Sequence, residues 1–187
     1  RAAALGEPYA VDVGLFCQER YFVYVAGFGA FTEVSYLTPQ DKKNILGHQA
    51  YMLESVRSLA SLRSYFMEVE WDGNFLEGEF VFGVVTNTIS VGGFKGLVGQ
   101  DVELNDGYFE ELLIRKPKNP ADISNLVAGL LQKEEKENDQ VYKFKTRSIR
   151  FRSSEPVDWV LDGEFGGTKT EVFVENLNKC LEIKRNK

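Results

Sequence analysis

Apolar and polar residues alternate along most of this chain, and alternation with a period of two is typical of β-strands that bury one face. The clearest case is residues 157–162, where Val157, Trp159 and Leu161 occupy every second position. Residues 80–87 are instead apolar at both parities, as expected for a strand buried on both faces. These patterns predict strands at residues 9–16, 20–27, 65–71, 80–87, 109–115, 141–146, 148–152, 157–162, 170–175 and 179–184.

Two segments have the three- and four-residue spacing of apolar side chains that is typical of an amphipathic helix. The first is residues 47–62, and the second begins at Pro120. Their apolar faces comprise Met52, Leu53, Val56, Leu59 and Ala60 in the first, and Ile123, Leu126, Val127, Leu130 and Leu131 in the second. Many short strands with two helices between them predict a mainly β fold, a β-sandwich or open barrel with two inserted helices. The length of 187 residues favours one domain, residues 1–187.

The composition narrows the class of protein. Hydrophobic residues make up 43% of the chain, enough for a packed core, and the net charge of -6 without a basic stripe argues against nucleic-acid binding. Cys17 and Cys180 lie far apart and outside any CxxC motif, so we interpret them as free thiols in a reducing compartment. No apolar run approaches the ~20 residues that span a bilayer, and we expect a cytoplasmic protein. The chain also begins without methionine, as the cut end of a larger protein would.

Candidate catalytic residues occur where the clearest strand ends. Asp162-Gly163 breaks that strand just before Glu164, and a chain extended through the break would place the two acids on the same side. A carboxylate at a strand end can take a proton from a substrate hydroxyl or hold a metal-bound phosphate. The alternative is an ordinary hairpin turn, because Asp-Gly is a common turn pair and also occurs at Asp72-Gly73 without any sign of chemistry.

Three other features have weaker functional signals. Residues 101–109 contain three acidic side chains and an amide that could hold a hard cation, although the spacing is not that of a helix-loop-helix calcium site and a plain turn is the simpler interpretation. His48, the only histidine, has no catalytic or metal-binding partners nearby in sequence, so we interpret it as structural or exposed. Gly27 and Gly29 lack the third glycine of a dinucleotide-binding fingerprint.

Several short motifs follow one another across nearly the whole chain. They are RYFVYVAGFG at residues 20–29, GHQAY at 47–51, VTN at 85–87 with Gly92-Gly93, LNDG at 104–107 and LDGE at 161–164. Together they resemble the carboxy-terminal domain of the soluble bacterial diacylglycerol kinase and lipid kinase family, which is related to the sphingosine kinases. This resemblance favours a functional interpretation of Asp162 and Glu164 over that of a plain turn.

The resemblance implies a two-domain architecture, in which an amino-terminal α/β domain binds ATP through a GGDGT loop and faces a carboxy-terminal β-sandwich across a cleft. No GGDGT occurs here, so residues 1–187 look like the second domain alone, which we expect to be inactive by itself. By resemblance, Glu164 is the general base that takes the proton from the primary hydroxyl of the lipid. Asp162 would orient Glu164 or steer the magnesium-bound triphosphate.

The turn at residues 105–108 resembles the structural magnesium site of the family. The resemblance makes the side chain of Asp106 a metal ligand, together with the backbone carbonyls of Glu103 and Tyr108. The implied cofactors are therefore Mg²⁺ and ATP. The implied partners are a lipid such as diacylglycerol and the membrane surface, which the protein would contact peripherally from the cytoplasm, and the resemblance also allows a homodimer.

Two departures from the family pattern affect the expected cleft. Tyr24 stands where the family usually has asparagine, and Phe31-Thr32 replace Asp-Ala, so the identity of the lipid stays open. Two other classes of function also remain open. One is a non-enzymatic β-sandwich that binds a lipid, a sugar or a protein. The other is a carboxylate-pair hydrolase such as a glycosidase, which needs two carboxyl groups ~5 to 9 Å apart.

Overall fold

The structure is a computed structural model that describes residues 6–29, 63–88, 90–91, 94–95, 102–131 and 139–185. Its strands are β1 (Glu7–Phe16), β2 (Arg20–Phe22), β3 (Val25–Gly29), β4 (Tyr65–Trp71), β5 (Asn74–Thr86), β6 (Ser90–Val91), β7 (Phe94–Lys95), β8 (Phe109–Arg115), β9 (Val141–Thr146), β10 (Ser148–Leu161) and β11 (Glu164–Arg185). The mainly β prediction is confirmed. The helix predicted at residues 47–62, with His48, and the departure at Phe31-Thr32 lie outside the described residues.

The helix predicted to begin at Pro120 is confirmed as α4 (Pro120–Leu131). Asn119 caps its amino terminus, because its side-chain oxygen accepts a hydrogen bond of 3.0 Å from the backbone N–H of Asp122. Proline suits the first helical position, where its missing N–H is not needed. Leu126, on the apolar face, is fully buried. In the described ranges, no helix combines the length and the apolar character needed to cross a membrane.

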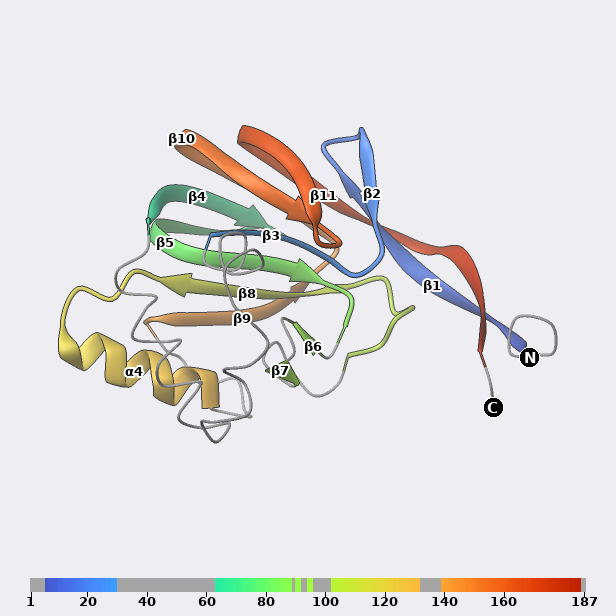
Figure 1. Ribbon diagram of the computed structural model, residues 1–187, viewed down its shortest axis with the longest axis horizontal. Coiled ribbons are helices and arrows are strands. Elements are labelled where there is room, and N and C mark those ends of the chain that lie inside the picture. The colour runs from blue at the N-terminus through green and yellow to red at the C-terminus, as the bar shows by residue number, and fades with distance from the viewer. Residues whose placement is uncertain are drawn as a thin grey trace, which may run out of the picture.

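The main sheet is antiparallel and closes on itself. Its strand order is β2-β1-β11-β10-β3-β5-β8-β9, and β4 pairs with both β10 and β5. The ladder β10-β3-β5-β4 therefore returns to β10 and forms a small barrel. Figure 1 shows β1 and the far end of β11 extending from the barrel as a two-stranded ribbon. The fold is thus one closed sheet with extra strands, in place of the two stacked sheets of a β-sandwich.

The barrel closes because long strands change partner along their length. Residues 149–153 of β10 pair with β4, and residues 159–161 pair with β3. Pro156 lies between these segments, where the register between β10 and β11 shifts. Proline inside sheets is confined to edges and bulges, and bulges bend strands. We predicted separate strands at 148–152 and 157–162, whereas the structure joins them into one bent strand.

Aromatic side chains fill the barrel. Trp159 is 1% exposed, and its ring centroid lies 5.1 to 5.5 Å from those of Phe16, Phe28 and Phe151. Gly83 lies against the ring of Phe28, where any added side chain would overlap that ring. The alternation that predicted this strand therefore reflects a densely packed interior, which holds the end of β10 in a defined position.

Candidate active site at the turn between β10 and β11

The turn that joins β10 and β11 has the geometry of an ordinary hairpin. Asp162 and Gly163 both have positive φ, 50° and 90°, as a type I′ turn requires. Asp72 and Gly73, between β4 and β5, have φ values of 43° and 82°. The local backbone therefore does not distinguish the two turns, and any difference between them must come from their surroundings.

The surroundings of Asp162 differ from those of Asp72. The Asp162 carboxylate accepts hydrogen bonds of 2.8 Å from the backbone N–H groups of Val23, Tyr24 and Val25. The carboxylate of Asp72 makes no hydrogen bond or ion pair within the described ranges. We predicted one continuous strand through Val23 and Tyr24, but the structure divides it into β2 and β3, because these amides turn toward Asp162. This occupied carboxylate argues against Asp162 as one of two free carboxylates in a glycosidase.

Glu164, like Asp162, has an exposed side chain, but it differs in its contacts. It is the first residue of β11, and it makes no hydrogen bond or ion pair with the part of the chain that the structure describes. The next residue, Phe165, is 59% exposed, and its carbonyl accepts a bond of 2.7 Å from Arg20 Nη1. That bond brings β2 alongside, where Tyr21 is 65% exposed. The turn therefore presents a carboxylate that is unpaired among the described residues, followed directly by the exposed side chain of Phe165.

A buried acid that the sequence analysis did not single out organises the second candidate region. Asp12 is fully buried, and its carboxylate accepts bonds of 2.7 Å from the N–H groups of Gly107 and Lys179, 2.9 Å from Asn178 Nδ2 and 3.3 Å from Asn176 Nδ2. In the sequence, the role of Asp12 could have been suspected because it is a single acid in the middle of an apolar strand. Asp12 ties the turn before β8 to β11.

These bonds also explain why β11 is longer than predicted. We predicted separate strands at residues 170–175 and 179–184, divided at an asparagine-rich stretch. The structure instead has one strand with a local irregularity, where Lys179 has φ 54° and the register between β1 and β11 shifts. The asparagines do not end the strand, because their side chains donate to Asp12.

The predicted metal ligand Asp106 lies in a short turn next to a lysine. One carboxylate oxygen accepts a bond of 3.0 Å from the N–H of Tyr108, and the other lies 3.4 Å from Lys145 Nζ. Lys145 Nζ also lies 3.1 Å from Glu110 Oε1. Burial raises the pKa of Glu110, and the nearby lysine opposes that effect without cancelling it. The structure therefore places an ammonium group between two carboxylates.

The other two predicted metal ligands were expected to act through their carbonyl groups. Glu103 is exposed, and Tyr108 is partly buried with its ring 4.8 Å from the guanidinium of Arg147. Within the described ranges, no three His, Cys, Asp or Glu side chains are placed to hold a metal ion together. A cation at this turn would therefore depend on Asp106 and backbone oxygens.

Glu111 is a buried acid of a different kind. It lies on β8 between the core residues Phe109 and Leu113, is fully buried, and has no hydrogen-bond partner for either carboxylate oxygen in the part of the chain described. Burial raises its pKa well above the ordinary value, and the neighbouring charge of Glu110 adds to this effect. Glu111 is therefore protonated in conditions where an exposed glutamate is ionised.

We predict that this residue makes the stability depend on pH. The folded protein keeps a proton that the unfolded chain releases near pH 4.3, so the unfolding free energy should fall with rising pH, by up to ~1.4 kcal/mol per pH unit, until the raised pKa is reached. Glu111→Gln should reduce this slope, because glutamine cannot ionise. Urea unfolding from about pH 5 to about pH 8 measures both slopes. Equal slopes in the two proteins would contradict the prediction.

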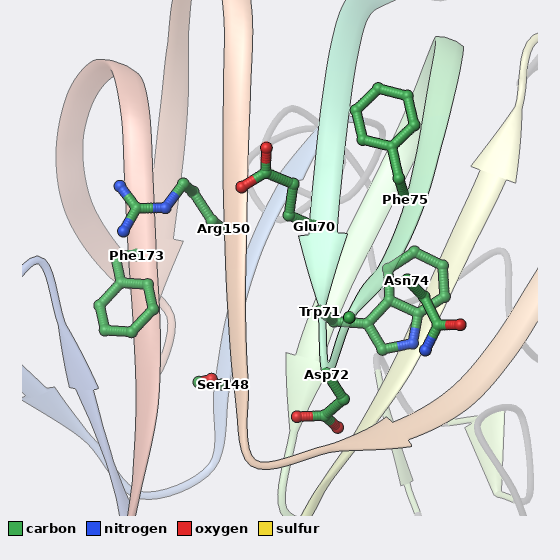
Figure 2. Close-up of a pocket in the computed structure, with 9 residues that line it drawn as sticks. Glu70, Trp71, Asp72, Asn74, Phe75, Ser148, Arg150 and Phe173 are labelled. Atoms are coloured by element: carbon green, nitrogen blue, oxygen red, sulfur yellow. The ribbon is translucent and has the colours of Figure 1, made fainter.

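A separate groove lies at the other end of β10. Its volume is about 420 Å³, and Figure 2 shows the lining residues, among them Glu70, Asp72, Ser148, Arg150 and Phe173. Two of its charged groups are paired with neighbours. Arg150 Nη1 lies 2.6 Å from Glu171 Oε1, and Glu70 Oε1 lies 2.8 Å from Arg152 Nη1 on β10. Ser148 begins β10 and the Asp162 turn follows its end, so the groove is distinct from the candidate active site.

Comparisons with known proteins agree on one group of enzymes. The chain is 37% identical over 173 residues to the diacylglycerol kinase of Bacillus subtilis, covering 92% of this chain and 56% of that protein. It is 32% identical over 178 residues to the diacylglycerol kinase of Staphylococcus epidermidis, covering 95% and 55%. It is 31% identical over the same length to that of Staphylococcus aureus. No protein-family model matches the chain.

Solved structures share the fold. Two crystal structures from Bacillus anthracis str. Sterne, both assigned to the diacylglycerol kinases, superpose with TM-scores of 0.73 and 0.64 at 21% and 16% identity. Each match covers 96% of this chain, and 58% or 55% of the other. The chain spans about half the length of the curated relatives that it matches.

Proposed function

We propose that this chain, which is homologous over nearly its whole length to one part of the bacterial diacylglycerol kinases, is the substrate-side domain of an ATP-dependent lipid kinase. In this proposal residues 1–187 form that domain, and a separate domain binds the nucleotide. The observation that carries it is the turn between β10 and β11, where the carboxylate of Asp162 holds the backbone and that of Glu164 is left exposed.

Glu164 would act as the general base. A carboxylate oxygen within about 2.6–3.2 Å of the lipid hydroxyl accepts its proton as the oxygen attacks the terminal phosphorus of ATP. The magnesium ion that accompanies the nucleotide would neutralise charge on the phosphates. Asp162 would be a positioning residue, since its three backbone bonds fix the turn that carries Glu164.

The surroundings of Glu164 suit a lipid substrate. Tyr21, Phe165 and Val23 are 65%, 59% and 45% exposed, and all lie on segments that hydrogen-bond at this turn. Tyrosine favours the interface between a membrane and water, because its ring is apolar and its hydroxyl group is polar. We therefore propose that the domain works in the cytoplasm, with peripheral contact at a membrane that contains diacylglycerol.

A structural cation at the turn before β8 is the second part of the proposal. The Asp106 carboxylate, with the backbone carbonyls of Glu103 and Tyr108, would supply oxygen ligands of the kind that Mg²⁺ prefers. Support comes from Asp12, which fixes the turn through the N–H of Gly107 at 2.7 Å. The ion would hold this turn and is not required for the proton transfer at Glu164.

A chimaera tests the proposed function. The matching 173-residue segment of the Bacillus subtilis diacylglycerol kinase is replaced by this chain, and transfer of labelled phosphate from ATP to diacylglycerol is measured in detergent micelles. We expect the chimaera to phosphorylate diacylglycerol and the isolated chain to be inactive. A chimaera that folds and binds ATP but transfers no phosphate to any glyceride would contradict the proposal.

A further inference from the structure

The ammonium group of Lys145 lies beside the carboxylate of Asp106, the side chain proposed to hold a cation at this turn. Its Nζ is 3.4 Å from Asp106 Oδ2 and 3.1 Å from Glu110 Oε1. Lys145 stands directly opposite Glu110 in the pairing of β9 with β8. Because the strand register sets this position, the lysine reaches both acids from a fixed point on the sheet and not from a mobile loop.

In the cluster of Asp106, Glu110 and Lys145, one carboxylate oxygen of Glu110 is available as a metal ligand. The Glu110 side chain is 2% exposed, and its Oε2 has no hydrogen-bond partner among the residues described. A buried carboxylate oxygen without a partner is costly, and a divalent cation would satisfy it. The Asp106 side chain is 22% exposed, so the cluster is also accessible to ions from solvent.

We propose that Lys145 is a built-in cation that competes with divalent metal ions for Asp106 and Glu110. The lysine supplies one positive charge and three N–H donors, which hold the turn when no metal is bound. A divalent ion at the same carboxylates would have to displace this ammonium or bind beside a like charge. The inference rests on the structural-cation part of the proposed function and makes that site weak in the natural protein.

Removing the lysine charge should therefore strengthen metal binding. In Lys145→Met, the combined formal charge of Asp106, Glu110 and residue 145 changes from −1 to −2, and the competing ammonium group is removed. We expect the affinity for Mn²⁺, used as a spectroscopic substitute for Mg²⁺, to rise at least tenfold in calorimetric titrations. Lys184→Met is the matched control, since it removes the same charge from an exposed lysine that pairs with Glu182 at 3.5 Å. Its affinity should equal that of the natural chain.

Further variants keep the test decisive. Lys145→Met combined with Asp106→Asn should lose the gained affinity, and Lys145→Arg, which keeps the charge, should bind Mn²⁺ as weakly as the natural chain. Unchanged affinity in Lys145→Met, an equal gain in Lys184→Met, or tight binding by Lys145→Arg would each overturn the proposal. If Lys145→Met does not fold, the proposal can still be tested with Lys145→Arg and the natural chain. Both keep a positive charge at position 145, so tight Mn²⁺ binding by either would exclude competition by the lysine.

These titrations use neither ATP nor lipid. A failed kinase assay in the chimaera would therefore leave the competition result standing, and a failed titration would leave Glu164 and its role unaffected. The two proposals can be refuted separately.

Discussion

Replacing Glu164 with glutamine in the chimaera is expected to lower the turnover of diacylglycerol by about 10²- to 10⁴-fold, the usual contribution of a general base. Glutamine has nearly the same shape but cannot accept the hydroxyl proton. The Glu164 side chain is exposed and makes no bond within the described residues, so folding should be unaffected. The affinity for ATP should also stay the same, because nucleotide binding is assigned to the other domain.

Two controls separate this role from a structural one. Glu175→Gln removes another exposed acid of β11 and should leave the turnover unchanged. Asp162→Asn should lower the thermal midpoint together with the turnover, because that carboxylate accepts three backbone bonds. The assignment of Glu164 as the base would be wrong if Glu164→Gln kept the turnover of the natural sequence.

Replacing Asp12 with alanine is expected to lower the unfolding free energy by about 3–5 kcal/mol, one of the larger effects of a single substitution. The change removes the buried carboxylate that accepts bonds from the N–H groups of Gly107 and Lys179 and from the amide of Asn178. A hydrogen bond to a charged group contributes about 1.5–3 kcal/mol. Urea unfolding at constant pH measures the total, and Glu77→Ala, an exposed site on β5, should change it by less than about 0.5 kcal/mol.

Hydrogen exchange provides a second readout for Asp12. The backbone amides of Gly107 and Lys179 should lose protection in Asp12→Ala before the rest of the sheet does, because each donates to that carboxylate at 2.7 Å. Asp12→Asn should have a smaller effect, since the amide oxygen still accepts one of these bonds. Protection that falls evenly over the whole sheet would show that Asp12 has no specific role at the turn.

The predictions that the structure confirms depend on residue patterns within short segments of the chain. Trp159 occupies a position of strict alternation and is buried, Pro120 opens a helix, and the Asp162-Gly163 pair forms a hairpin turn. Each follows from neighbours within a few residues, because side-chain period and turn conformation are properties of the local chain. The resemblance to the lipid kinases, carried by short motifs, is likewise supported by the homology over nearly the whole chain.

The predictions that failed concern strand ends and sheet closure. Residues 148–152 and 157–162 were predicted as separate strands, but both belong to one bent strand, β10, that pairs with two partners. Val23 and Tyr24 suggested a continuous strand, but their amides bond to a carboxylate that lies 139 and 138 positions later in the chain, respectively. Such partners are distant in sequence, so no local pattern contains them.

The sequence by itself determined the β-rich class, the helix at Pro120, the turn residues and the candidate base Glu164. Tertiary structure alone decided that the sheet closes into a barrel, that Asp12 and Asp162 each fasten remote backbone segments, and that Lys145 stands between two acids. The physical reason is that alternation and turn chemistry act over a few residues, whereas the fate of a polar group depends on which distant donor or acceptor the fold brings to it.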